Sequence, residues 1–200
     1  MKIRNGFVSN SSSSSFIVGF KRKPKTVAEV KELLFGDEKY IKQYDYSLST
    51  QEAAEMVFSD MHGKKPLTKS QMLTEFRSGW FEGYPHFDYR NRPSDAIRNE
   101  LYSKFPSESE NLWAPKKIKN KEAKALSRKF IETTQAEWAE QRKQVDEAAK
   151  EIFERKVVPT MKGYKVFAFN YSDNGDGERG SVMEHGNIFH NLPHFQTSQH

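Results

Sequence analysis

The sequence predicts an α+β protein, in which a small antiparallel sheet is built from an N-terminal strand and a C-terminal hairpin around a helical middle that includes one long helix. Strand-forming residues gather near both ends of the 200-residue chain, and helix-capping signals recur between them. The 15 Phe, 8 Tyr and 3 Trp argue against general disorder. We therefore expect a single domain over residues 1–200, with residues 21–158 as a helical insertion between the first strand and the hairpin.

The first strand is expected at residues 16–20, an apolar run that ends at a basic stretch before Pro24. Three helices follow with capping-box spacing, a Thr or Ser three residues before a Glu or Gln, and with a glycine after the apolar face. The residues that mark the start and the end of each helix are Thr26 and Gly36, Ser49 and Gly63, and Thr68 and Gly79. A fourth helix opens at Ser94 and stops before Pro106.

The longest helix is expected over roughly residues 116–157, ended by Pro159. Its apolar stripe repeats every seven residues, at Ile131, Trp138, Val145 and Ile152. A straight helix of this length would approach about 60 Å, so it should bend, break near Asn120 or project towards a partner. The stripe faces either the protein's own core or a second copy, and a homo-oligomer through this helix stays open.

The C-terminal hairpin is expected from the alternation of residues 164–171, which predicts a strand, and from the turn residues 172–177. A second strand at about residues 180–184 would complete it. Because two strands alone are marginal in water, we expect the strand at residues 16–20 to pair with this hairpin.

Composition excludes several classes of protein. No cysteine is present, which excludes disulfide scaffolds, thiolate metal sites and cysteine nucleophiles. No apolar run is long enough for a transmembrane helix, and the N-terminus lacks the apolar segment of a signal peptide. We expect a cytoplasmic protein without a membrane partner.

The net charge of +5 is concentrated in one segment. Between residues 116 and 129 the only acid is Glu122, and the basic residues are Lys116, Lys117, Lys119, Lys121, Lys124, Arg128 and Lys129. Such a run is either a solvated helix face or a surface that binds a nucleic acid or an acidic host protein. A smaller basic cluster lies at residues 21–25.

Residues 79–93 combine aromatic and basic side chains without periodicity, which is typical of a loop. Trp80, Tyr84, Arg90 and Arg92 are the candidates here, because aromatic faces stack on bases and arginines contact phosphates. The alternative is that the rings pack onto the helices and keep their polar ends in water.

The serine run at residues 9–15 is either a flexible linker or a turn whose hydroxyl and N–H groups hold an anion. It lacks the glycines and lysine of a P-loop, and no G-x-S-x-G elbow marks a nucleophile. Ser11 and Ser13 are the candidates if one of the serines is catalytic.

Acids and histidines gather near the C-terminus. Asp173, Glu184 and His185 are candidates for general acid–base chemistry, and Asp173, Asp176, His185 and His190 for a divalent metal site. The spacing matches no metal motif, because Pro193 interrupts the histidines and the acidic turn does not follow the EF-hand pattern. The alternative is a hairpin turn with surface histidines.

The segment FVSNSSSSSF at residues 7–16, together with the acidic turn YSDNGDG at residues 171–177 and the following EHG, resembles the ends of a scattered set of uncharacterised phage and bacterial proteins. The resemblance implies a phage or bacterial origin, with the bacterial host cytoplasm as the location of a phage-encoded protein. It also implies that the serine run is more than a linker. The set has no agreed activity, so it assigns no catalytic residue.

Two functions stay open. The first is an accessory protein that binds nucleic acid or an acidic host protein through the local basic helix surface. The second is a metal- or phosphate-dependent hydrolase or transferase, with its site between the serine run and the C-terminal acids and histidines. The sequence favours the first, because no catalytic spacing is present, and it leaves open whether the protein is an enzyme.

Overall fold

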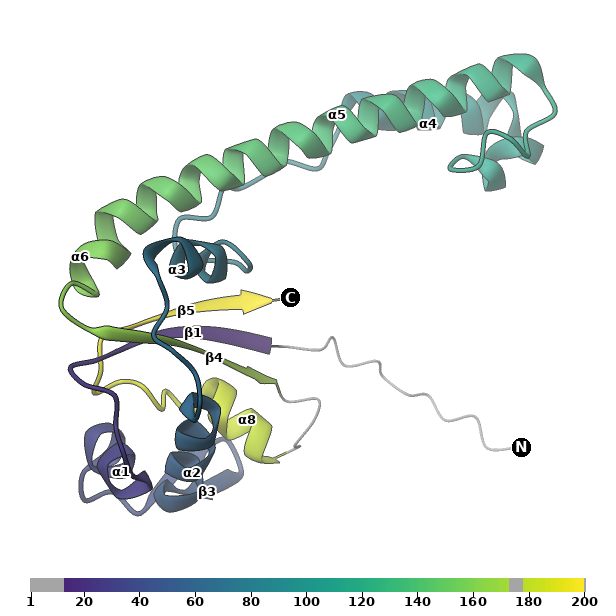
Figure 1. The fold of residues 1–200 in the computed structure, drawn as a ribbon. Coiled ribbons are helices and arrows are strands. Elements are labelled where there is room, and N and C mark those ends of the chain that lie inside the picture. The colour runs from purple at the N-terminus through teal and green to yellow at the C-terminus, as the bar shows by residue number, and fades with distance from the viewer. Residues whose placement is uncertain (1–12, 173–177, 200) are drawn as a thin grey trace, which may run out of the picture. The chain divides into compact units, whose positions relative to one another are not determined.

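The computed structural model describes residues 13–172 and 178–199 (Figure 1). By its internal contacts the chain falls into two compact units. The first unit comprises residues 1–84 and 148–200, and the second comprises residues 85–147. Each is described by itself below.

A three-stranded antiparallel sheet forms the centre of the first unit. Strand β1 (Ser13–Phe20) lies in the middle, between β4 (Lys165–Ser172) and β5 (His194–Gln199). Phe16 of β1 stands opposite Phe169 of β4 and Gln196 of β5. The α+β class and the pairing of the N-terminal strand with C-terminal strands are therefore confirmed.

The predicted position of the second C-terminal strand is wrong. Residues 180–184 belong to helix α8 (Glu178–His185), and the third strand of the sheet is β5, further along the chain. Since β1 separates β4 from β5, these two strands form no hairpin with each other. Helix α8 buries Val182 and Met183 in the core of this unit, and such long-range packing outweighs the local strand preference of valine.

The helices with capping signals form as predicted. They are α1 (Val27–Phe35), α2 (Thr50–Met61) and α3 (Lys69–Phe76). The side chains of Thr26, Ser49 and Thr68 each accept a hydrogen bond from the backbone N–H three residues on. A short hairpin of β2 (Tyr40–Gln43) and β3 (Tyr46–Ser49), which the sequence did not predict, lies between α1 and α2.

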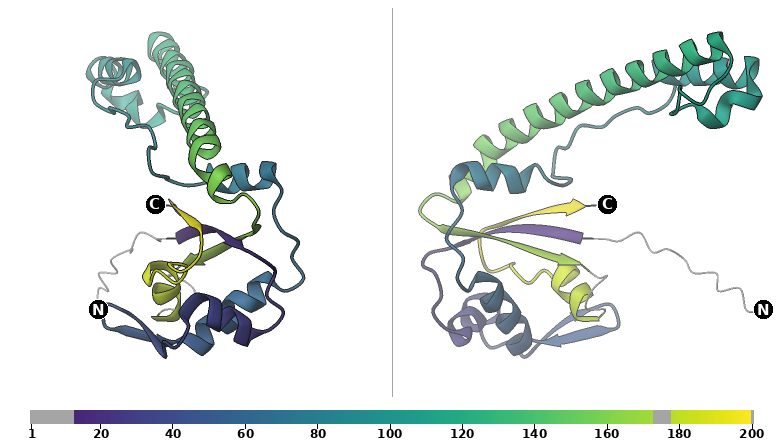
Figure 2. Two further views of the ribbon diagram at one scale, coloured as in Figure 1. Left: turned by 90° about the vertical axis from the view of Figure 1, so that its left-hand side faces the viewer. Right: turned by 45° about the vertical axis from the view of Figure 1, so that its right-hand side comes forward.

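Two layers cover the sheet (Figures 1 and 2). Helices α1, α2 and α8 pack on the face that carries Phe16, Val18 and Phe20. Helix α3 lies on the opposite face, where Phe76 contacts Phe195 of β5. The alternation of β1 thus buries both of its faces, as expected for a central strand.

The second unit is helical. It contains α4 (Pro93–Lys104), the 3₁₀-helix η1 (Pro106–Asn111) and the part of α5 (Lys121–Ile152) that reaches residue 147. Helix α5 begins directly after Asn120, whose side-chain oxygen accepts hydrogen bonds from the N–H groups of Glu122 and Ala123. The long helix is therefore confirmed, with its start a few residues later than predicted.

Beyond residue 152 the helical backbone continues through a π-helical turn, η2 (Phe153–Val157), and α6 (Val158–Thr160). Pro159 is tolerated near the start of α6, and the helix ends one residue later. None of the helices in the two described ranges is long and apolar enough to cross a membrane.

Candidate functional site

The first candidate site lies at one end of the sheet, around the buried carboxylate of Glu184, which is 1% exposed. Ser14 Oγ donates a hydrogen bond of 3.3 Å to Glu184 Oε1 and accepts one of 3.0 Å from Gln196 Nε2. His185 Nε2 lies 3.7 Å from Glu184 Oε2. The fold thus brings Ser14, from the described end of the serine run, next to the predicted acid–histidine pair.

This arrangement suits a structural polar network better than a nucleophile. Ser14 is only 2% exposed, and its hydroxyl bonds to a carboxylate and an amide, whereas a nucleophilic serine needs access to substrate and a base within reach. Ser13, Ser14 and Ser15 form the start of β1 rather than a turn or linker. Ser15 Oγ donates to Asn170 Oδ1 across the strand pair.

Of the other candidates from the ends of the chain, only some lie in the part that the structure describes. Ser11, Asp173 and Asp176 lie outside the described residues. His190 is exposed, and its Nδ1 lies 3.0 Å from the Asn187 carbonyl oxygen. Among the residues that the structure describes, no group of three or more His, Asp or Glu side chains could hold a metal ion.

Tyr171 lies on β4 near the same end of the sheet. Burial raises the pKa of its phenol well above the ordinary value, and the nearby Asp60 carboxylate raises it further. Tyr171 therefore stays protonated and contributes its ring to the core.

The second candidate site is the segment between residues 116 and 129 in the second unit. Six of its seven basic residues are exposed, and Lys124 is half-buried. Within the described ranges, none of the seven side chains forms an ion pair. The one acid of the segment, Glu122, lies 3.9 Å from Lys104, which is outside it. We call these seven side chains the basic surface.

The helix periodicity of α5 explains why this charge stays in solvent. Lys121, Lys124 and Arg128 share one side of the helix, at positions i, i+3 and i+7, opposite the buried Ala123 and Phe130. Because the apolar side is fixed against Leu101 and Leu112 of the same unit, folding turns the basic side outward. Lys116, Lys117 and Lys119 precede the helix and are also exposed.

Glu100, an acidic residue of the same unit, pairs with a lysine outside the basic surface. The Glu100 carboxylate lies 2.7 Å from Lys104 Nζ, and this hydrogen bond lowers the pKa of Glu100 and raises that of Lys104. Lys104 thus pairs with Glu100, and the charge of Lys129, which forms no ion pair within the described ranges, lowers the pKa of Glu100 further.

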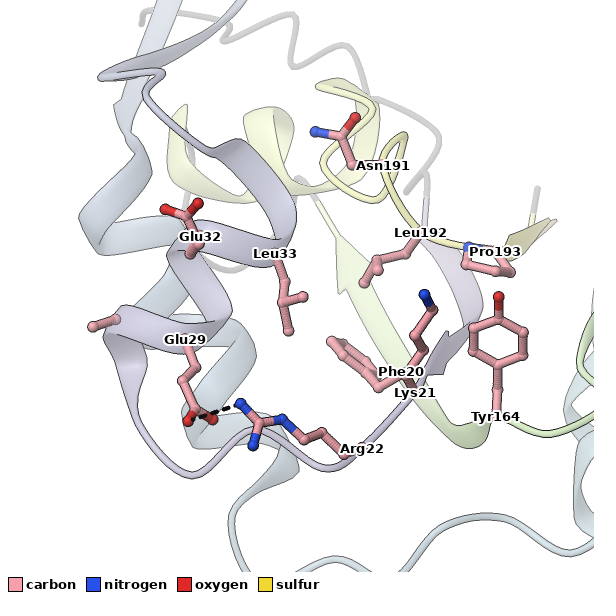
Figure 3. A pocket seen from close by; sticks show the side chains of 11 residues that line it. Phe20, Lys21, Arg22, Glu29, Glu32, Leu33, Tyr164, Asn191, Leu192 and Pro193 are labelled. Carbon is pink, nitrogen blue, oxygen red and sulfur yellow. Dashed lines mark hydrogen bonds and ion pairs between the residues drawn. The ribbon is translucent and has the colours of Figure 1, made fainter.

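The smaller basic cluster at residues 21–25 differs, because its charges are partly used within the first unit. Arg22 lies 3.5 Å from Glu29, and Lys23 Nζ donates to the Lys64 carbonyl at 2.7 Å. Lys21 and Arg22 border a mostly apolar groove of about 840 Å³ between α1 and residues 191–193 (Figure 3). No local pattern predicts this groove, because its walls come from segments that are distant in the chain.

The aromatic–arginine loop divides between the two units. Trp80 and Tyr84 belong to the first unit, where their rings stack with centroids 4.3 Å apart. Arg90 and Arg92 belong to the second unit. Arg92 lies over the Tyr89 ring, 5.4 Å from its centroid, and 3.7 Å from Asp95.

The second unit also contains a small cavity that the sequence does not predict. It measures about 220 Å³ and lies between α4 and α5, with Trp113 and Trp138 on its wall. These two rings stack nearly parallel, at 5.8 Å and 13°, although 25 residues separate them in the chain. Trp138 carried a signal as part of the seven-residue stripe, but nothing local marks Trp113 as its neighbour.

Comparisons with protein-family models, with curated proteins and with solved structures found no match to this chain.

Proposed function

We propose that this protein binds nucleic acid, as an accessory protein, through the basic surface of its second unit. The observation that carries this proposal is the set of seven basic side chains that forms no ion pair within the described residues, in a segment with a single acid. The resemblance of both chain ends to phage and bacterial proteins adds a setting to the proposal, the cytoplasm of a bacterial host.

The basic side chains are available to a partner because they form no ion pairs within the described residues. Surface ion pairs contribute at most about 1 kcal/mol each, so unpaired lysines cost the fold little. When they meet a row of phosphates they release condensed counterions, and this release drives the binding. An acidic protein presents fewer and less regular charges than a nucleic-acid backbone, so we favour nucleic acid as the partner.

The test is a salt titration of nucleic-acid binding with two triple variants of the full-length chain. Lys121, Lys124 and Arg128 are replaced by Gln in the first variant, because Gln keeps the helix propensity of the segment. The matched control carries Gln at Lys39, Lys42 and Lys65, three exposed lysines of the first unit without ion pairs in the described ranges.

We expect the first variant to flatten the slope of log Kobs against log salt by about 2 to 3, since each phosphate contact contributes about 0.7–0.9. The control removes the same charge and should keep nearly the full slope. If the salt slope flattened equally in both variants, binding would depend only on the net charge of the protein, and this result would contradict a local binding surface. Tight binding of an acidic protein with no affinity for nucleic acid would assign the basic surface to a protein partner instead.

A further inference from the structure

The cavity of the second unit is bounded by aromatic rings and lined in part by polar groups. Trp113 and Trp138 are 54% and 44% exposed, although Trp113 also packs edge-to-face on the buried Phe130 at 4.9 Å. Asp95 and Arg98, an ion pair of 3.0 Å, line it from α4.

A buried hydroxyl lines the same cavity. Thr134 is 4% exposed, and within the described residues its Oγ1 has no hydrogen-bond partner. Buried polar groups are almost always hydrogen-bonded, so this hydroxyl is available to bond to a water molecule or to a ligand that enters the cavity. Phe130, Thr134 and Trp138 stand at i, i+4 and i+8 of α5, which places the hydroxyl between two aromatic residues.

The volume of the cavity limits what it can hold. About 220 Å³ is far more than the roughly 10–15 Å³ that one water requires. It is less than the roughly 300–1,000 Å³ of pockets for drug-sized ligands. One planar ring system with hydrogen-bonding edges fits these limits.

We propose that this cavity receives one unstacked base of a single-stranded nucleic acid. This inference rests on the proposed function and names its substrate class. The base stacks against the exposed tryptophan faces, and its polar edge hydrogen-bonds to Thr134 Oγ1. Lys116 and Lys117, three and four residues after Trp113, and Lys129, next to Phe130, contact the flanking phosphates.

Only a single strand offers a base that is free to enter the cavity. A duplex keeps its bases stacked and paired, so neither their faces nor their Watson–Crick edges reach a cavity of this kind. Stacking of a base on an aromatic side chain tolerates any base, because every base has a π-face. Thr134 can donate or accept a hydrogen bond, so the site discriminates weakly among bases.

The experiment measures tryptophan fluorescence of the full-length chain with Trp80 replaced by Phe, so that only Trp113 and Trp138 report. The probes are an oligothymidine of about fifteen nucleotides, within the range of known single-strand sites, and a duplex of the same length. We expect the single strand to quench the fluorescence on binding and the duplex to leave it nearly unchanged.

Two variants test the cavity itself. Trp138→Ala should weaken oligothymidine binding about 5- to 150-fold with little change in its salt slope, and Trp138→Phe should restore most of it. The matched control is Tyr40→Ala, which removes an exposed aromatic side chain from the first unit and should leave the affinity for oligothymidine unchanged. Thr134→Val keeps the packing, so it should fold at least as stably as the parent while binding more weakly.

The outcomes separate this inference from the proposed function. If the Lys121, Lys124 and Arg128 triple variant loses binding while Trp138→Ala and Thr134→Val bind normally, the cavity holds no base but the basic surface stands. Equal quenching by single strand and duplex also overturns the inference. Quenching by an acidic, tyrosine-containing peptide but by neither oligonucleotide would assign the cavity to a protein partner. Absence of any salt-dependent binding by the parent protein contradicts the proposed function itself.

Discussion

Ser14 holds a buried carboxylate in place at one end of the sheet. Its hydroxyl connects Glu184 of α8 to Gln196 of β5, so one side chain joins a helix and the edge strand of the sheet. Removing a partner from a buried charged group costs more than the hydrogen bond itself contributes, because the remaining group loses its solvation without compensation.

We expect Ser14→Ala to lower the free energy of unfolding by about 1–3 kcal/mol. The measurement is a urea titration followed by circular dichroism. Ser47→Ala provides the control, because Ser47 is an exposed serine of β3, and it should change the free energy by less than about 0.5 kcal/mol. Equal effects of the two substitutions would show that the Glu184 network adds no stability.

Tyr171 gives a prediction at alkaline pH. Burial and then Asp60 raise the pKa of its phenol above the value of about 10 in the unfolded chain. Because the pKa is raised in the folded state, the contribution of Tyr171 to the stability of the folded protein is fully present below about pH 10. This contribution is lost as the pH rises towards the folded-state pKa.

Tyr171→Phe removes this ionisation but keeps the ring. We therefore expect the variant to gain stability relative to the parent between about pH 9 and about pH 11, measured as the difference in free energy of unfolding. Lysines titrate in the same range in both proteins and cancel in the difference. A difference that stays constant across this range would contradict a raised pKa.

At the scale of elements, the capping residues show why the helices of the first unit could be predicted. Ser49 accepts from the Glu52 N–H, and the Glu52 carboxylate accepts from Ser49, so the signal and its structure lie within four residues. The Ser49 hydroxyl, followed by its backbone N–H, lowers the pKa of Glu52. A local device of this kind is readable from sequence because it needs no distant partner.

Ser49→Ala should destabilise the protein by about 1 kcal/mol at neutral pH, as loss of an N-cap does. Since the folded-state pKa of Glu52 is depressed, its contribution is present above the unfolded value of about 4.3 and is lost as the pH falls through the folded value. The difference in the free energy of unfolding between Ser49→Ala and the parent, measured by urea titration, should therefore become smaller at acidic pH. Ser59→Ala, an exposed position inside α2, is the matched control and should be neutral or slightly stabilising.

The elements that could not be predicted depend on distant partners. Residues 180–184 have the strand preference of Val182, yet they form a helix because α8 buries this residue with Met183 against the rest of the core. The β2–β3 hairpin is only four residues per strand and carries mostly polar or exposed side chains, so no periodicity marks it. Local pattern is a weak guide where packing decides the conformation.

At the scale of the whole molecule, one candidate site could be predicted from local sequence and the other depends on segments that are distant in the chain. The basic surface was visible in the sequence because its charges are contiguous, and the structure adds that none of them is paired within the described ranges. The cavity beside Trp113 and Trp138 could not be predicted, because α4, residues 112–113 and α5 have to pack before its walls meet. The serine run and the C-terminal acids were expected to lie close together, and the burial of Ser14 and Glu184 favours a structural role for this pair.

The most direct test of nucleic-acid binding by the basic surface is the affinity of the unmodified full-length protein for a single-stranded oligonucleotide, measured across a range of salt concentrations. If most of the seven basic side chains contact phosphates, log Kobs should fall linearly with log salt, with a slope of about −3 to −5. No binding at low salt, or binding that does not change with salt, would contradict the proposal.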